Sequence, residues 1–459
     1  MIAPLNPTIP PAAFAPEPAR PPAKSDGCCE CGERGVVMTL LGFSALWLVV
    51  GAVLALIASL KLISPSLLAS CPYVTYGRVY PAGLNALLFG FASQAAIAVT
   101  LWLICRIGAV SLRLSIAACF GALAWNVGVA VGLFEILAGN STGFEWLEMP
   151  RSAAGILLAG YLLLALSALK TLRDRTVQTL AVSQWYLIGA LFSFPWLYSG
   201  AVSLLMCVPV RGAVQASVNA WFIAGFSHLW LGAVAIAVLY HFIPQAVGRP
   251  VANEGLARFG FWSLMIVGAW TGLQPGTPLP AWLVSASGAM AALLLVPTAA
   301  VVVNLWNTAG GDWRKLFAGF FGVALTAFTL WNLLLVLAAC PRIGDALRFG
   351  GLEATKLQLG LMFASAALFG AAYRIVPELL GREWPSSKLL VAHWQLSLAG
   401  LVLAFSSPFG GKFTFPAVFL LGALLFAVNL VQIGLAHCRA TCDCSEWFAA
   451  DANAGRAGA

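Results

Sequence analysis

The side chains of this chain that could bind a metal ion are few and widely separated. Four histidines occur in 459 residues, at positions 228, 241, 393 and 437. Imidazole suits several transition metals, but a metal centre needs two or more ligands that face one another. No two of these histidines lie at ligand spacing in the sequence. The apolar body of the chain therefore offers no compact metal-binding motif of its own.

Cysteines form a cluster before the apolar body and another after it. The first cluster lies within residues 28–31. The second cluster, which adds one imidazole to three thiols, consists of His437, Cys438, Cys442 and Cys444. Thiolates and imidazole together can hold zinc or copper(I), which makes the second cluster a candidate metal site. Because the spacing matches no established motif, the alternative is that these are unrelated thiols kept reduced in the cytoplasm.

The composition predicts that these groups are carried by membrane helices. The chain is 61% hydrophobic and 9% charged, with a mean hydropathy of +0.89. Such a chain cannot bury its apolar surface in one water-soluble core, so we expect an all-α polytopic membrane protein in contact with the lipid bilayer. About twelve apolar stretches are long enough to span it. Their expected ranges are 36–63, 83–105, 114–138, 152–169, 182–205, 218–245, 260–275, 282–306, 316–339, 352–378, 391–409 and 414–436.

Positive charge predicts the orientation of these spans. Lys and Arg gather in alternate loops, with about 17 of the 25 on one side of the membrane. By the positive-inside rule both termini face the cytoplasm. The net charge of +8 then reflects topology and contact with anionic lipids, and it gives no reason to expect nucleic-acid binding.

The same patterns predict three regions. Residues 1–35 form a Pro/Ala-rich, disordered cytoplasmic arm with the first cysteine cluster. Residues 36–437 form one membrane domain. Residues 438–459 form a short cytoplasmic tail with the remaining clustered cysteines.

Several sequence blocks inside the membrane domain occur together in a characteristic order. Residues 240–249 and 373–382 share the pattern Tyr, then Pro four residues later, then Gly-Arg, which is typical of a helix that ends at a membrane face. The further blocks are 77–86, 221–249, 270–282 and 353–384. In this order they resemble subunit I of the heme-copper oxidases, and most closely the cbb-type cytochrome c oxidases, over residues 36–410. The resemblance implies a bundle of twelve membrane helices.

The resemblance also implies cofactors that this chain is not equipped to hold. In that family six histidines bind two hemes, of the b type in this branch, and a copper ion. We expect no bound cofactor here, because the corresponding positions carry other residues. These positions are Gly83, Ala224 or Gly225, Leu273-Gln274-Pro275 and Lys356-Leu357-Gln358.

Two residues near these positions remain candidates for cofactor binding. His228 lies about one turn after Ala224, so its ring could face the same interior, although a polar residue packed between helices is the alternative. Lys356 could fill the space of a metal with its ammonium group, paired with Glu353 on the same helix face, or it could reach the membrane surface. His241 and His393 are predicted to lie at helix ends as membrane-surface residues.

Three functions follow from this sequence. The first is a degenerate subunit I-like protein of a bacterial-type inner membrane, associated with respiratory electron transport and with other respiratory-complex subunits, but without an oxygen-reducing centre of its own. The second is an oxidase subunit that retains heme through unusual ligands. The third is a membrane carrier or metal-handling protein that reuses the bundle. For the first function we expect protein side chains to fill the space of the missing ligands.

Overall fold

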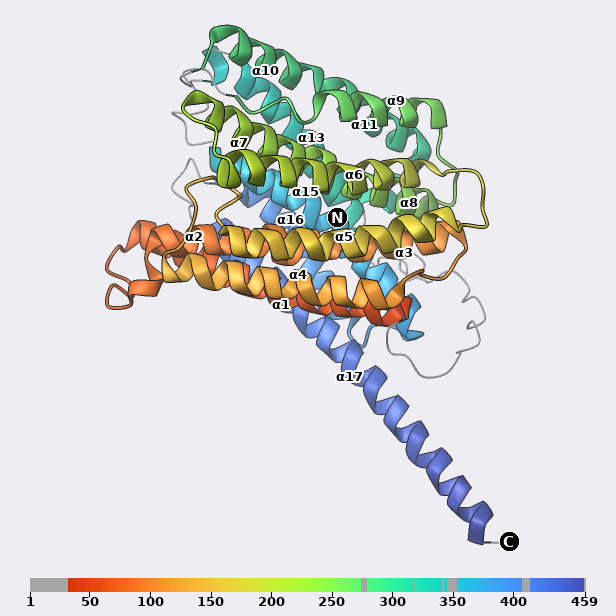
Figure 1. Ribbon diagram of the computed structural model, residues 1–459. Coiled ribbons are helices and arrows are strands. Elements are labelled where there is room, and N and C mark those ends of the chain that lie inside the picture. Colours follow the sequence, from red (N-terminus) through yellow and green to blue (C-terminus); the bar gives the residue numbers. More distant parts are fainter. Residues whose placement is uncertain are drawn as a thin grey trace, which may run out of the picture.

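The computed structural model describes residues 32–273, 279–317, 319–340, 342–344, 353–406 and 413–457. Within these ranges the regular structure consists of helices, with no strand. Most of the helices lie side by side in one bundle (Figure 1). The prediction of an all-α membrane bundle is confirmed.

The long helices follow the apolar stretches of the sequence, and short turns connect them. The helices are α1 (Glu33–Ile63), α2 (Tyr76–Asn85), α3 (Gln94–Gly108), α4 (Ser115–Ala138), α5 (Arg151–Arg173), α6 (Val182–Val202), α7 (Ala213–Gly225), α8 (Ala233–Val247), α9 (Glu254–Val267), α10 (Ala281–Leu293), α11 (Leu295–Ala309), α12 (Trp313–Phe317), α13 (Phe320–Ala339), α15 (Glu353–Leu380), α16 (Ser387–Leu403) and α17 (Thr414–Ala457). A 3-10 turn, η2 (Pro72–Val74), and three π-helical segments, η3 (Ala86–Ser93), η4 (Ser203–Cys207) and η5 (Phe226–Gly232), complete them.

Ten helical spans in the described part of the chain are long and apolar enough to cross a membrane. The two remaining stretches of the twelve expected from sequence are shorter helices. They are α16, with 17 residues, and α9, with 14 residues. The predicted count of twelve is therefore approximate. The expected stretch at 260–275 begins earlier than predicted, because α9 starts at Glu254, where the Asn253 side chain caps it by accepting from the Leu256 amide.

Two spans form the interior of the bundle. The most apolar window of the span Tyr76–Gly108, which joins α2, η3 and α3, is completely buried, and that of Ala213–Val247 is 89% buried. Outer helices such as α4 expose large apolar side chains, including Phe120 and Phe134. In a bilayer these exposed groups face lipid, so their exposure carries no penalty. Gly83 and His228 lie on these two spans.

Both interior spans contain a π-helical segment directly after a position of interest. The segment η3 follows Gly83 by three residues, and η5 follows Gly225 at once. A π-helical turn inserts one extra residue per turn, and such turns occur often at functional sites. They alter the direction of the side chains that follow, among them His228 in η5.

Buried amides connect the outer helices to the interior. The Gln94 and Asn126 side chains exchange two hydrogen bonds, at 3.0 and 3.1 Å, and Trp47 Nε1 donates to Asn126 Oδ1 at 3.0 Å. These bonds join α3, α4 and α1. A polar side chain inside a membrane bundle needs such partners because lipid offers none.

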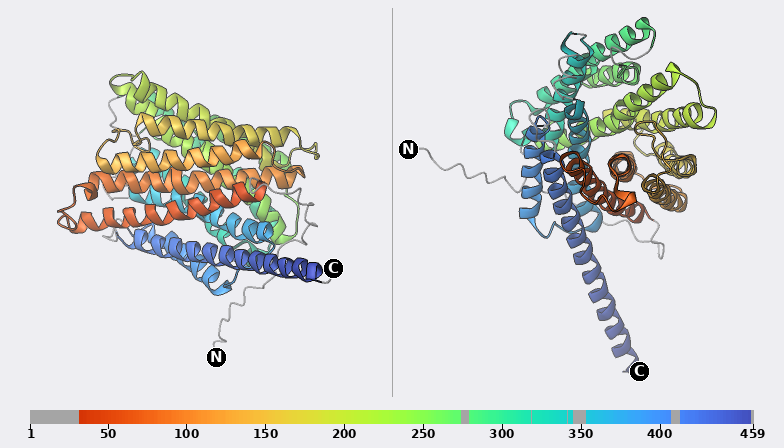
Figure 2. Two further views of the ribbon diagram at one scale, coloured as in Figure 1. Left: turned by 60° about the horizontal axis from the view of Figure 1, so that its bottom comes forward. Right: turned by 90° about the vertical axis from the view of Figure 1, so that its left-hand side faces the viewer.

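The ends of the described chain meet at one end of the bundle. The Arg34 guanidinium, at the start of α1, hydrogen-bonds the His437 ring on α17. Beyond this contact α17 continues away from the bundle as a helix (Figures 1 and 2). The start of α1 and the middle of α17 therefore lie at the same end of the bundle. The compartment they face, like the division into arm, membrane domain and tail, stays a prediction.

Candidate functional site

Gly83, on the interior span, has no room for a side chain. A Cβ atom built there would lie 3.0 Å from the Ala55 amide nitrogen, 3.1 Å from Leu54 Cβ and 3.3 Å from the Gly51 carbonyl oxygen. Two of these three neighbours are backbone atoms of α1, which cannot swing aside as a side-chain tip can. Helix α1 therefore occupies the place where a ligand at position 83 would have to stand.

The second interior position is closed by a leucine. A Cβ on Gly225 would lie 2.4 Å from Leu197 Cδ2, on α6. Ala224 beside it is buried, and its carbonyl oxygen receives a local hydrogen bond. Both glycines are thus in close contact with neighbouring helices, and the expectation that protein fills the whole space of the missing ligands stays a prediction.

Aromatic rings from η3, α4, α5, α6 and η5 pack together in the interior. Their centroids are 4.3–6.5 Å apart in pairs, in tilted, stacked and edge-to-face arrangements. The rings belong to Phe89, Trp125, Tyr161, Phe194, Tyr198, Phe226 and Trp230. Each is at most 2% exposed, so this region is a packed core.

His228 lies in the same interior, and half of its ring is engaged. Its side chain is 3% exposed, and its Nδ1 hydrogen-bonds the Ala224 carbonyl oxygen at 3.0 Å. The ring stacks on Trp331 of α13 with centroids 4.4 Å apart and planes 12° apart. Within the described residues Nε2 has no hydrogen-bond partner. His228 is thus a buried imidazole whose Nε2 makes no hydrogen bond with the described residues, while the Asn332 side chain lies close enough to interact with the ring.

Lys356 lies on α15, the helix that packs on Trp331 through Gly360. The indole of Trp331 lies 3.2 Å from a Cβ built on Gly360, one turn after Lys356 on α15. Lys356 itself is half-buried. The Glu353 side chain, and likewise Gln274 and Pro275, lie outside the described residues. The Glu353–Lys356 pair therefore stays a prediction.

The cysteine cluster after the membrane domain is described only in part. Cys438 is exposed and His437 is half-buried against Arg34, while the side chains of Cys442 and Cys444 lie outside the described residues. In the part of the chain that the structure describes, no group of three or more His, Cys, Asp or Glu could hold a metal ion. The proposed metal site at this cluster stays a prediction.

The prediction for His393 is wrong. His393 does not lie at the membrane surface but is 1% exposed, among α13, α15, α16 and α17. Its Nδ1 is 3.1 Å from the Tyr373 hydroxyl. A signal was present in the sequence, because His393, Ser397 and Gly400 recur at spacings of four and three and so share one helix face. His241, by contrast, is half-buried beside Trp102 and accepts a hydrogen bond from Gln245.

Sequence reasoning also missed a buried carboxyl group in the connection between α4 and α5. Glu148 is buried, and Asn85 Nδ2, two residues after Gly83, donates to its Oε2 at 2.6 Å. Burial raises the pKa of this carboxyl above its ordinary value, and the hydrogen bond from Asn85 acts in the opposite direction. No motif in the sequence marked this pair, since the partners are far apart in the chain.

The larger of two cavities described in the bundle lies away from these positions. It has a volume of about 570 Å³ and opens beside Arg106, His241, Gln245 and Glu254. Gly83, Ala224, His228 and Lys356 do not line it. Its walls combine these charged and polar groups with apolar side chains such as Ile107 and Val251.

Comparison with known proteins relates the whole bundle to one family. The profile of the family described as cytochrome c and quinol oxidase polypeptide I matches residues 35–411. The chain is 24% identical over 389 residues to the Cbb3-type cytochrome c oxidase subunit CcoN1 of Stutzerimonas stutzeri, covering 81% of each chain. It is also 24% identical over 428 residues to a cytochrome c oxidase subunit 1 homolog of Agrobacterium tumefaciens, covering 85% of this chain and 75% of that one.

A solved structure shares the fold. The chain is similar to a heme-copper terminal oxidase, solved as a dimer by cryo-electron microscopy, with a TM-score of 0.65 and 12% identity. The match covers 88% of this chain and 82% of the other. At this identity the likeness concerns the arrangement of helices, and the chemistry of each position has to be argued from this chain's own residues.

Proposed function

Because the chain belongs to the family of cytochrome c and quinol oxidase polypeptide I, we propose that it is a respiratory-type membrane protein without an oxygen-reducing centre of its own. It keeps the subunit I bundle, resides in a bacterial-type inner membrane with both termini in the cytoplasm, and associates there with other respiratory subunits. The lysine and arginine distribution supports this orientation.

The residues present do not fit two hemes and a copper ion. Only four histidines exist, and three have other surroundings: His393 pairs with Tyr373, His241 with Gln245, and His437 with Arg34 at the end of the bundle. His228 alone lies beside the second closed position. One free imidazole nitrogen cannot hold iron and copper side by side.

The observation that carries the proposal is the contact between Gly83 and α1. A ligand residue missing from an open pocket could be replaced by one from elsewhere. Here the backbone of α1 lies against the Gly83 position, so a side chain at that site would have to displace the helix by a few tenths of an ångström or more. The small residues Gly51 and Ala55 allow this approach, in the small-xxx-small pattern by which membrane helices pack closely.

The test is a heme determination on the purified protein. We expect an optical spectrum without a Soret band and a pyridine hemochrome assay with no stoichiometric heme. A cbb-type subunit I purified in parallel controls for heme supply and for loss in detergent. About one heme per chain in this protein contradicts the proposal.

A second candidate function, retention of one heme, is favoured by a single observation. His228 Nε2 is buried and has no partner among the described residues. If a Soret band is found, substitution H228A should abolish it, whereas H393A should not. A band that persists in H228A rejects this candidate as well.

A further inference from the structure

His393 is held inside the bundle by aromatic rings from three other helices. Its ring centroid lies 4.9 Å from that of Phe320 on α13, 4.5 Å from Phe369 on α15 and 5.9 Å from Phe426 on α17. A polar ring in such surroundings needs hydrogen bonds at both nitrogens, because an unmade bond in a low-dielectric interior is costly.

The Nδ1 nitrogen of this ring lies at the end of a chain of polar contacts that runs through Tyr373 to Asn429. Asn429 Nδ2, on α17, donates to the Tyr373 hydroxyl oxygen at 3.4 Å. The hydroxyl proton of Tyr373 is then free to point at His393 Nδ1, 3.1 Å away. With the Tyr373 hydroxyl as the donor in this contact, Nδ1 accepts, and a neutral imidazole that accepts at Nδ1 carries its proton on Nε2.

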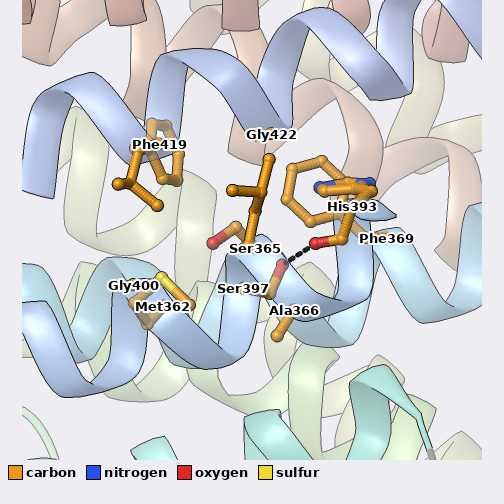
Figure 3. Close-up of a pocket in the computed structure, with 11 residues that line it drawn as sticks. Met362, Ser365, Ala366, Phe369, His393, Ser397, Gly400, Phe419 and Gly422 are labelled. Carbon is orange, nitrogen blue, oxygen red and sulfur yellow. Dashed lines mark hydrogen bonds between the residues drawn. The ribbon is translucent and has the colours of Figure 1, made fainter. Parts of the chain in front are cut away.

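Next to this ring the structure contains a small cavity between α15, α16 and α17. Figure 3 shows His393 and the hydroxyls of Ser365 and Ser397 around it. Its volume, about 20 Å³, is the space in which the centre of a water molecule can move. A single water molecule needs about 10–15 Å³ on this measure. Among the described residues Nε2 has no hydrogen-bond partner in the protein.

The two serines present acceptors to this cavity. The Ser365 hydroxyl donates to the Leu361 carbonyl oxygen, and the Ser397 hydroxyl donates to the His393 carbonyl oxygen at 3.0 Å. Each hydroxyl proton is thus used in a hydrogen bond to a backbone carbonyl, while each hydroxyl oxygen keeps lone pairs that can accept a hydrogen bond from another donor. The cavity therefore combines one donor, the Nε2–H of His393, with two acceptors.

We propose that this cavity is a binding site for one water molecule. The water accepts a hydrogen bond from His393 Nε2–H and donates its two protons to Ser365 Oγ and Ser397 Oγ. It then makes three hydrogen bonds, the usual number for a buried water. The water completes a chain of polar contacts that joins α15, α16 and α17, and it holds His393 as a neutral Nε2–H tautomer that is not a metal ligand.

Solid-state NMR of the protein in lipid bilayers, with ¹⁵N-labelled histidine, tests this site. The H393N variant assigns the His393 signals by their absence. We expect an unprotonated Nδ1, a protonated Nε2 and transfer of magnetisation from a bound water to the Nε2 proton. A proton on Nδ1, or an Nε2 proton without water contact, overturns the proposal.

Two variants separate a bound water from bulk water. The double variant S365A/S397A removes both acceptors and should lose the water transfer. G422A places a methyl group 3.5 Å from Nε2 and 3.2 Å from Cδ2, inside the cavity, and should lose it even where the serine variant does not fold. The control S263A removes a serine of α9 that also bonds its own helix backbone, and it should change nothing. Water transfer that survives in both cavity variants contradicts the site.

Discussion

Substitution G83A measures how tightly α1 closes the interior. The new methyl carbon would lie 3.0–3.3 Å from three atoms of α1, a few tenths of an ångström closer than ordinary contact. Overpacking of this kind costs about 1–3 kcal/mol. Replacing glycine by alanine inside a helix returns up to about 1 kcal/mol. With the full gain in helix propensity, we therefore expect G83A to lower the free energy of unfolding by up to about 2 kcal/mol.

The matched control is G42A, on α1 itself. A Cβ at Gly42 meets nothing within 4 Å, so only the gain in helix propensity remains. Thermal unfolding in detergent, followed by the fluorescence of the 17 tryptophans, compares the two variants with the parent protein. The expected order of midpoints is G42A equal to or above the parent, and G83A below it.

The larger substitution G83H restores a histidine at the position where the resembled family has one. Because the contact is with backbone atoms of α1, we expect G83H to be less stable than G83A and to remain without heme. If G83A unfolds at the same temperature as G42A, or if G83H acquires a Soret band, then α1 does not close this position and the reasoning is refuted.

Three further predictions concern other parts of the molecule. Substitution N126L should lower the free energy of unfolding, measured with a chemical denaturant, by about 1–2 kcal/mol, because it leaves the buried Gln94 amide without partners. The double variant Q94L/N126L should lose less stability than the sum of the two single variants. Additive losses would show that the two amides do not interact. Because the pKa of Glu148 is raised in the folded protein, its contribution to stability is complete below the pKa of the unfolded carboxyl and is lost as pH rises through the folded pKa. E148Q should therefore gain stability relative to the parent as the pH rises above the pKa of the unfolded carboxyl, and a pH-independent difference contradicts this. In intact cells a membrane-impermeant thiol reagent should not label Cys28 or Cys444, and labelling of either from outside rejects the predicted orientation.

The sequence by itself determined the class of fold and the number of apolar stretches. Each of the twelve predicted stretches corresponds to a helix or a pair of joined helices. The physical reason is that a membrane span must be about 20 apolar residues long and helical, which is a local property of the chain. The residue types also support the proposal that the oxygen-reducing centre is absent, since a chain with four histidines cannot supply six histidine ligands.

Only the tertiary structure decided which residues face the interior. Lipid is as apolar as a leucine side chain, so hydropathy distinguishes a membrane span from a loop but does not distinguish its lipid face from its packed face. His393 is buried because Phe320, Phe369 and Phe426 surround it, and Gly83 is closed because α1 lies against it. Both facts depend on neighbours that are distant in sequence, and these contacts form only when the bundle packs.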